Sequence, residues 1–223
     1  MVLQPKGLLF DFDGTLYGDW RLWVSTIQET LNDFNIAATA YEALEKARDM
    51  IKQGTFYNIN GVAIAMAREK GVDGEAEVRA RFLEKLDRVM DSTGPGETMV
   101  NVLEELEGKG VLMGIVTFQR RPRLEHRLEA WNLKNYFRSI VTPEQHPEFK
   151  PSPAPFLAAI KELAIPAARC LVVGDEPVDM IGGRKAGAET IGLPQGFFSE
   201  EELREAGADH IISSLTKLPA LVQ

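Results

Sequence analysis

Residues 7–16 read GLLFDFDGTL, a short apolar run that ends in two aspartates separated by one residue. The run Gly7–Asp11 is apolar without alternation, which is typical of a strand covered on both faces. The spacing of Asp11 and Asp13 places both carboxylates on the same side of an extended segment. Gly14 follows at once and indicates a turn. This stretch therefore predicts a buried strand that carries two carboxylates at its carboxyl end.

Five further apolar runs follow the same pattern, with helix-like stretches between them. The runs are Val111–Thr117, Ser139–Thr142, Cys170–Asp175, Glu189–Leu193 and His210–Ser213. The helical patterns cover about 97–109, 121–131, 153–164, 178–187 and 199–206. Alternation of this kind predicts an α/β fold whose core is a Rossmann-like, doubly wound parallel sheet.

The segment 17–94 interrupts this alternation. It contains no convincing strand and predicts four helices, near 20–35, 39–53, 60–71 and 74–91. Gly94-Pro95-Gly96 closes the segment with strong turn chemistry. We expect residues 17–94 to form an inserted α-helical unit, and residues 1–16 plus 95–223 to form the core. Helices that merely extend the core would give the same pattern.

Composition excludes several functional classes. The 223 residues carry 25 Lys and Arg against 33 Asp and Glu, a formal charge of -8. Because so acidic a surface repels phosphate backbones and anionic lipids, we expect neither nucleic acid nor membrane as a partner. No apolar run approaches the roughly 18 residues of a membrane span, and no signal-peptide pattern is present, so we expect a cytoplasmic protein. Cys170, the single cysteine, lies in an apolar run and is interpreted as a small buried hydrophobe.

Polar residues follow four of the predicted strands. They are Asp11-x-Asp13-Gly14-Thr15, then Thr117, then Lys150, then Gly174-Asp175-Glu176-x-x-Asp179. Each has an ordinary explanation when taken alone, such as a turn or a solvated loop. The carboxyl ends of parallel strands meet at one sheet edge, however, and ligands of open α/β sheets bind there. Their convergence predicts a functional site.

Charge decides what such a site can do. Two like charges 4 Å apart repel by about 4 kcal/mol at an effective dielectric of 20, so clustered carboxylates need a divalent cation before a phosphate can approach. Oxygen ligands select Mg²⁺ over zinc. Lys150 adds a second positive charge, and the hydroxyls of Thr15 and Thr117 can hold phosphate oxygens. We therefore expect phosphoryl transfer, with Asp11 as nucleophile and Asp13 as general acid and base.

The ordered motifs resemble those of the haloacid dehalogenase superfamily. The resemblance rests on four stretches: Phe10-Asp11-Phe12-Asp13-Gly14-Thr15-Leu16, Thr117, Lys150-Pro151-Ser152-Pro153 and Gly174-Asp175-Glu176-Pro177-Val178-Asp179. The helical insertion resembles the cap domain of the phosphoglycolate phosphatase and β-phosphoglucomutase branch. The resemblance implies that Asp11 attacks phosphorus to form an aspartyl phosphate. It implies that Asp13 protonates the departing oxygen and later deprotonates water.

The resemblance also implies a set of ligands. Mg²⁺ would be held by Asp11, the backbone carbonyl of Asp13, and Asp175. Asp179 would act through water or by orienting Lys150, and Thr117 and Lys150 would grip the phosphoryl oxygens. Phe118 stands where the family often has a small polar residue, so its backbone N–H alone would serve there. Asp13 distinguishes the chain from true dehalogenases, which lack a carboxylate at that position. We therefore do not expect the protein to cleave carbon–halogen bonds.

The expected activity is a magnesium-dependent phosphatase that hydrolyses a small phosphorylated metabolite. A sugar-phosphate mutase of the β-phosphoglucomutase kind would use the same aspartates and is the alternative within the enzymes. A non-catalytic binding module on this fold would lack Asp11, Asp13 or Lys150. A phospho-accepting receiver domain or a dinucleotide-binding enzyme would carry its key residues at other positions. The sequence is compatible with a monomer or a small homo-oligomer.

Overall fold

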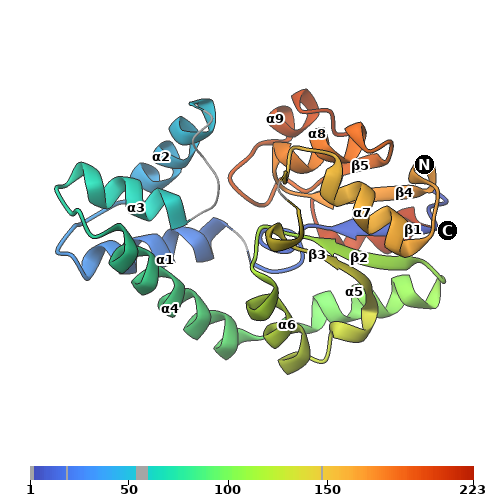
Figure 1. Ribbon diagram of the computed structural model, residues 1–223, viewed down its shortest axis with the longest axis horizontal. Helices are drawn as coiled ribbons and strands as arrows, with labels where there is room; N and C mark the ends of the chain where they lie inside the picture. Colours follow the sequence, from blue (N-terminus) through green and yellow to red (C-terminus); the bar gives the residue numbers. More distant parts are fainter. Residues whose placement is uncertain (1–2, 19, 54–59, 147) are drawn as a thin grey trace. The chain divides into compact units, whose positions relative to one another are not determined.

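The computed structural model describes residues 3–18, 20–53, 60–146 and 148–223 (Figure 1). The chain divides into two compact units. One combines Met1–Asp19 with Pro95–Gln223, and the other is Trp20–Gly94. The division thus falls slightly after residue 17, where the helical insertion was expected to start.

Within the described residues, a sheet of six parallel strands forms the centre of the larger unit, in the order β3-β2-β1-β4-β5-β6. The strands are β1 Gly7–Phe10, β2 Leu112–Val116, β3 Phe137–Val141, β4 Cys170–Gly174, β5 Glu189–Gly192 and β6 His210–Ile211. Strand β1 lies between β2 and β4, so the direction in which strands are added reverses there. The predicted doubly wound parallel sheet is confirmed, and its switch point is at β1.

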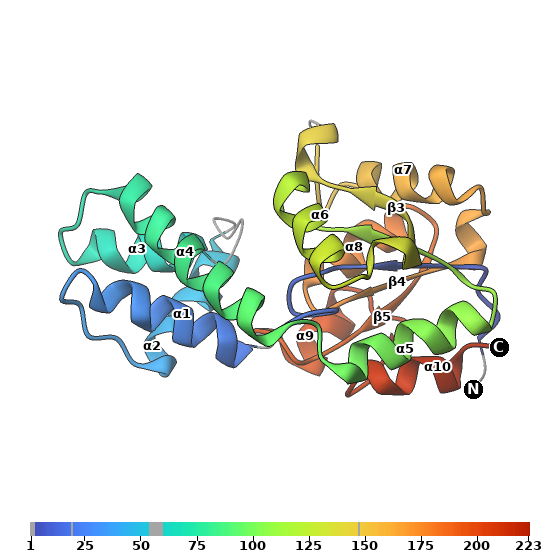
Figure 2. The same cartoon turned by 90° about the horizontal axis from the view of Figure 1, so that it is seen from below.

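Helices cover both faces of this sheet. They are α5 Glu97–Gly108, α6 Arg121–Ala130, α7 Ala154–Leu163, α8 Pro177–Lys185, α9 Glu200–Glu205 and α10 Leu218–Leu221. Helix α7 packs on β1, β2 and β3, and α8 packs on β4 and β5. Helix α5 packs on α10, and Figure 2 shows these two on the opposite side of the sheet from α7.

The core beneath α7 holds the central strands together. Phe156, Ile160 and Leu163 recur at helical spacing and pack with Leu9 and Val172 from the sheet. Full burial of one such side chain stabilises the fold by about 1.5–3 kcal/mol. Proline at the first turn of α7 keeps the helix from extending backwards, because proline cannot supply the N–H that a helix interior needs. The preceding loop is therefore left to carry Lys150.

The described residues of the smaller unit form helices joined by loops and contain no strand. It contains α1 Trp20–Asn32, α2 Ala40–Lys52, α3 Asn60–Glu69 and α4 Glu75–Thr93. Helix α1 packs on the other three, and its Ile27 and Leu31 are buried together with Val62 of α3 and Phe82 of α4. None of the described helices in either unit is both long enough and apolar enough to cross a bilayer.

Candidate active site

The aspartate at the centre of the site, Asp11, comes directly after strand β1. The backbone N–H of Asp11 donates to the carbonyl of Val173 at 2.9 Å, which ties the end of β1 to β4. The chain then turns at Gly14, whose φ of 85° favours glycine because no Cβ is present to clash. This course leaves the Asp11 side chain buried and Asp13 partly exposed.

Lys150 extends from the loop after β3 and lies against two aspartates. Its Nζ is 2.6 Å from Asp11 Oδ1 and 2.7 Å from Asp179 Oδ1, and all three residues are buried. Burial alone would lower the pKa of Lys150, but the Asp11 and Asp179 carboxylates raise that pKa above its ordinary value. The ammonium group therefore stays charged at neutral pH.

Three buried carboxylates form a candidate metal site. Asp11, Asp175 after β4 and Asp179 in the first turn of α8 each offer an oxygen within 4.8 Å of the others. Burial and the charge of Asp11 raise the pKa of Asp175 well above its ordinary value. Burial also raises the pKa of Asp179 to about 6, against the pull of Lys150. Because all the donors are oxygens and they repel one another, a hard divalent cation fits this set.

Thr15 lies beside this carboxylate cluster. Its Oγ1 donates a hydrogen bond of 2.8 Å to Asp175 Oδ1, and the threonine is itself buried. In the structure the Thr15 hydroxyl therefore donates to a carboxylate. The phosphate contact expected of Thr15 would need the hydroxyl to turn away from Asp175.

The end of strand β2 contributes Thr117 and Phe118. Thr117 is fully buried, and its Oγ1 accepts a hydrogen bond from the backbone N–H of Gln119 at 3.2 Å. The Phe118 ring centroid lies 5.5 Å from Lys150 Nζ and packs edge-on against Phe149. Phe118 thus packs against the lysine with its side chain, a contact that a small polar residue could not make.

Asp13 is bound to a residue that the sequence did not single out. Gln119 Nε2 donates to Asp13 Oδ1 at 2.7 Å. Burial and the charge of Asp11 raise the pKa of Asp13 to about 6, although the Gln119 hydrogen bond and the charges of Arg127 and Arg123 act to lower it. The side chain can therefore hold or release a proton near neutral pH, as a general acid and base must.

Contacts in the structure link five of the expected residues directly: Asp11, Thr15, Lys150, Asp175 and Asp179. The Asp13 side chain lies outside the three-carboxylate cluster and contacts Gln119 instead. The alternation that singled out Asp11 and Asp13 also applies to Thr117 and Gln119, and it could have identified the glutamine.

Two further residues of the site were given no role from the sequence, although Glu176 stands in the motif between Asp175 and Asp179. Glu176 forms a capping box at the start of α8, and burial followed by the charge of Asp179 raises its pKa to about 8. Gln195, in the loop after β5, donates its Nε2 to the backbone carbonyl of Gly14 at 2.9 Å. Nothing in the residues around Gln195 marks a loop that reaches across to the turn after β1.

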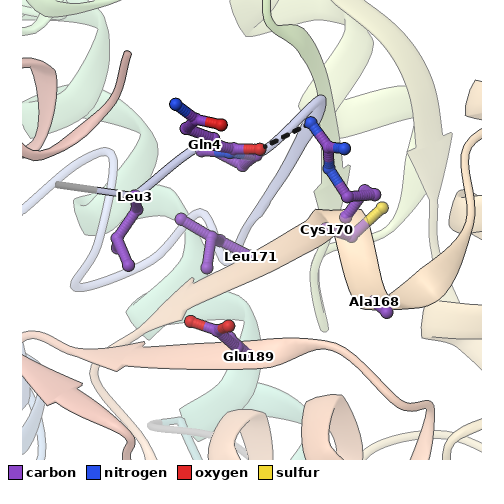
Figure 3. A pocket seen from close by; sticks show the side chains of 8 residues that line it. Leu3, Gln4, Ala168, Cys170, Leu171 and Glu189 are labelled. Atoms are coloured by element: carbon purple, nitrogen blue, oxygen red, sulfur yellow. Dashed lines mark hydrogen bonds between the residues drawn. The ribbon is translucent and has the colours of Figure 1, made fainter.

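A small cavity at the opposite end of the strands does not compete with this site. It has a volume of about 60 Å³ and is lined by residues that include Gln4, Cys170 and Glu189 (Figure 3). The Arg169 side chain, which also lines it, donates to the backbone carbonyl of Gln4 at 3.0 Å. A volume of this size holds about two water molecules and is too small for a metabolite.

Comparison with known proteins identifies the family. The sequence model described as haloacid dehalogenase-like hydrolase matches residues 8–193, which is well over half of the chain. The chain belongs to the haloacid dehalogenase-like hydrolase family. The expected resemblance is confirmed, and the protein is an enzyme of the hydrolase class.

Several proteins similar to this haloacid dehalogenase-like hydrolase are named as phosphatases. A phosphoglycolate phosphatase of Vibrio parahaemolyticus is 26% identical over 97% of this chain and 96% of that protein. An N-acetylmuramic acid 6-phosphate phosphatase of Pseudomonas putida is 27% identical over 99% of this chain and 97% of that protein. A Clostridium perfringens protein assigned as the pyrophosphatase PpaX is 30% identical, but the match covers 55% of this chain and 57% of that protein.

Solved structures share the fold of this haloacid dehalogenase-like hydrolase. A protein of Haemophilus somnus assigned as a phosphoglycolate phosphatase gives a TM-score of 0.78 at 20% identity, over 99% of each chain. A protein of Thermotoga maritima assigned as a β-phosphoglucomutase gives 0.76 at 18% identity, over 97% of each chain. At these sequence identities the structural similarity supports the fold only. The reaction has to be inferred from the residues of the site.

Proposed function

We propose that the protein is a magnesium-dependent phosphatase that hydrolyses a small phosphomonoester through an aspartyl-phosphate intermediate at Asp11. The observation that carries the proposal is the position of Asp11. Its carboxylate contacts the Lys150 ammonium group at 2.6 Å and also belongs to the buried cluster with Asp175 and Asp179. With a divalent cation held by this cluster and Lys150 beside it, such a nucleophile could meet an anionic phosphoryl group without prohibitive repulsion.

The reaction needs two proton transfers, and Asp13 is suited to both. An Asp11 carboxylate oxygen forms a bond to phosphorus while the bond from phosphorus to the leaving oxygen breaks. Protonated Asp13 gives its proton to that leaving oxygen. Ionised Asp13 then takes a proton from the water that attacks the aspartyl phosphate, which releases phosphate and restores Asp11. A pKa near 6 suits this alternation.

The remaining residues would bind the charged groups. Asp11, the backbone carbonyl of Asp13, and Asp175 would hold Mg²⁺, which supplies positive charge against the phosphoryl oxygens when it is bound. Asp179, in contact with Lys150 at 2.7 Å, would orient the lysine. Lys150, the Thr117 hydroxyl and the backbone N–H of Phe118 would bind phosphoryl oxygens. Thr15 would join them when it turns away from Asp175.

The substrate is proposed only as a class. The relatives are named for phosphoglycolate, pyrophosphate and N-acetylmuramic acid 6-phosphate, and what these compounds share is a transferable phosphoryl group. The residues of the larger unit account for recognition of that group. We therefore expect a small phosphorylated metabolite whose remaining part is recognised elsewhere.

Phosphate release from p-nitrophenyl phosphate tests the proposal, with Mg²⁺ and with a chelator. We expect Mg²⁺-dependent release by the wild type and by Asp91→Asn, a control at an exposed aspartate of α4, and no release by Asp11→Asn. Full activity of Asp11→Asn would remove Asp11 as the nucleophile. Conversion of a hexose 1-phosphate to its 6-phosphate without phosphate release would replace the hydrolase by a mutase.

A further inference from the structure

A chain of polar groups leads from the buried Arg127 of helix α6 through Gln119 to Asp13, both of which are partly exposed. Arg127 of α6 is only 1% exposed, and its Nη1 donates to Gln119 Oε1 at 2.8 Å. Gln119 Nε2 in turn donates to Asp13 Oδ1 at 2.7 Å. The backbone N–H of Gln119 also donates to Thr117 Oγ1. Gln119 is thus held from two sides and contacts the proposed general acid with its side chain.

The chemistry of these groups fixes the orientation of the amide. A guanidinium group can only donate hydrogen bonds, so the side of Gln119 that faces Arg127 must be its carbonyl oxygen. The amide NH₂ therefore faces Asp13. Since Asp13 Oδ1 already accepts from this NH₂, a proton on the neutral carboxyl group is directed to Oδ2.

We propose that Gln119, oriented by the buried Arg127, is a positioning residue that holds the Asp13 carboxyl group with its proton on Oδ2, ready for the leaving oxygen. The inference rests on the proposed function. It gives a role to Gln119, which lies two residues after Thr117, the threonine proposed to bind phosphate. The backbone turn fixes the path of the chain at Asp13, whereas the Gln119 hydrogen bond fixes the rotation of its side chain.

The dependence on the leaving group separates positioning from a merely structural role. An alkyl alkoxide leaves poorly unless it is protonated, whereas dinitrophenolate leaves as a stabilised anion and needs no acid. We therefore compare kcat/KM for 2,4-dinitrophenyl phosphate with kcat/KM for a panel of alkyl phosphates that includes phosphoglycolate and glucose 6-phosphate. The quantity kcat/KM covers the steps through the transfer to Asp11, so slow hydrolysis of the intermediate does not hide the effect.

Two variants of Gln119 test the contact, and one matched control accompanies them. Gln119→Leu removes the amide, and Gln119→Glu keeps an acceptor for Arg127 but cannot donate to Asp13 when ionised. The control is Gln145→Leu, because Gln145 is an exposed glutamine that accepts from Arg121 at 2.7 Å. Circular dichroism and thermal melting establish that each variant is folded.

A general acid contributes about 10²–10⁴-fold to the rate, so an enzyme whose general acid is mispositioned should lose a large part of this rate enhancement. We expect both Gln119 variants to lose about 10-fold to 100-fold in kcat/KM for the alkyl phosphates and less than about 3-fold for the aryl phosphate. Gln145→Leu should leave the ratio between the two substrates at the wild-type value. An unchanged ratio in folded Gln119 variants overturns the inference and leaves the phosphatase in place. A wild type that hydrolyses none of the substrates with Mg²⁺ overturns both.

Discussion

Lys150 and Asp11 are 139 residues apart in the chain, yet Lys150 Nζ lies 2.6 Å from Asp11 Oδ1 at the carboxyl edge of the sheet. Asp179 approaches the same nitrogen at 2.7 Å. A buried ion pair is weak evidence for stability, since desolvation of the charges offsets their attraction. Its position beside the proposed nucleophile is better explained by chemistry. In the proposed reaction the lysine would neutralise the attacking carboxylate and turn the same charge toward a phosphoryl oxygen.

Removal of this ammonium group should therefore affect turnover strongly. Loss of one preorganised donor to a developing negative charge typically costs about 10²–10³-fold in rate, and we expect Lys150→Ala to lose at least that much in kcat/KM. Lys161→Ala, at an exposed lysine of α7, is the control and should retain wild-type activity. Steady-state kinetics with p-nitrophenyl phosphate measure both. Near wild-type kcat/KM for a folded Lys150→Ala variant contradicts the role assigned to the lysine.

The carboxylates of the site make a prediction about pH and metal. In the metal-free protein the pKa values of Asp13 and Asp179 are raised to about 6 and that of Glu176 to about 8, whereas the unfolded groups titrate near 4. Between these values the folded state binds more protons than the unfolded state. The stability of the metal-free protein should accordingly fall as pH rises from about 5 to 8.

Mg²⁺ should reverse this loss, because it binds the ionised carboxylates of the folded state. A ligand at 100 times its Kd adds about 2.7 kcal/mol of stability, equivalent to about 5–10 °C in Tm for a chain of this size. We expect the Mg²⁺-induced rise in Tm to be larger at pH 8 than at pH 5.5. Asp175→Asn should remove most of it, and Asp91→Asn should not. Equal rises for wild type and Asp175→Asn would place the metal elsewhere.

Gly14 should be irreplaceable for a reason specific to the site. A Cβ at this position would lie 2.3 Å from Asp175 Oδ2, and its φ of 85° is unfavourable for alanine. Gly14→Ala should displace Asp175 and lower both activity and the Mg²⁺-induced rise in Tm. Gly71→Ala is a matched control, since Gly71 has a φ of 83° and a Cβ there meets nothing within 4 Å. Both variants should lose about 1 kcal/mol or more to backbone strain, but only Gly14→Ala should lose activity.

The fold could be predicted because the chain has clear strand patterns and clear helix patterns. Non-alternating apolar runs predicted the parallel strands, and the segment 17–94, which lacks such runs, predicted an inserted helical unit. The ends of elements were less certain: β6 was expected over 210–213 but pairs as a strand only at His210–Ile211. This strand lies at the edge of the sheet and pairs on one side only, so its length depends on Ile191 and Gly192 of the neighbouring strand.

The site could be predicted only where its residues follow strands in sequence. Asp11, Thr117 and Asp175 come at or just after strand ends, so the topology alone brings them to one edge. Arg127 could not be inferred in this way, because arginine on an amphipathic helix is ordinarily exposed. Its burial depends on the contact between α6 and Gln119, which the sequence pattern of the helix does not specify. Contacts made by helix side chains depend on packing, which a pattern in the sequence does not specify.

Cys170 allows a prediction about the core that is independent of the catalytic chemistry. This thiol is 1% exposed in strand β4, and burial raises its pKa to about 11. The thiol of an unfolded chain has a pKa near 8.5, so at pH 8 the folded protein should hold on the order of 100-fold less thiolate than the unfolded chain. A disulfide reagent should therefore label Cys170 slowly in buffer and quickly in denaturant. Because the chain has one cysteine, the labelling signal belongs to that residue alone. The unfolded thiol loses its proton at lower pH than the folded one, so stability should also decline from about pH 9 to 11, and Cys170→Ala should lack this component of the decline. Rapid stoichiometric labelling of the native protein at pH 8 would show instead that the strand opens or that the thiol is reactive.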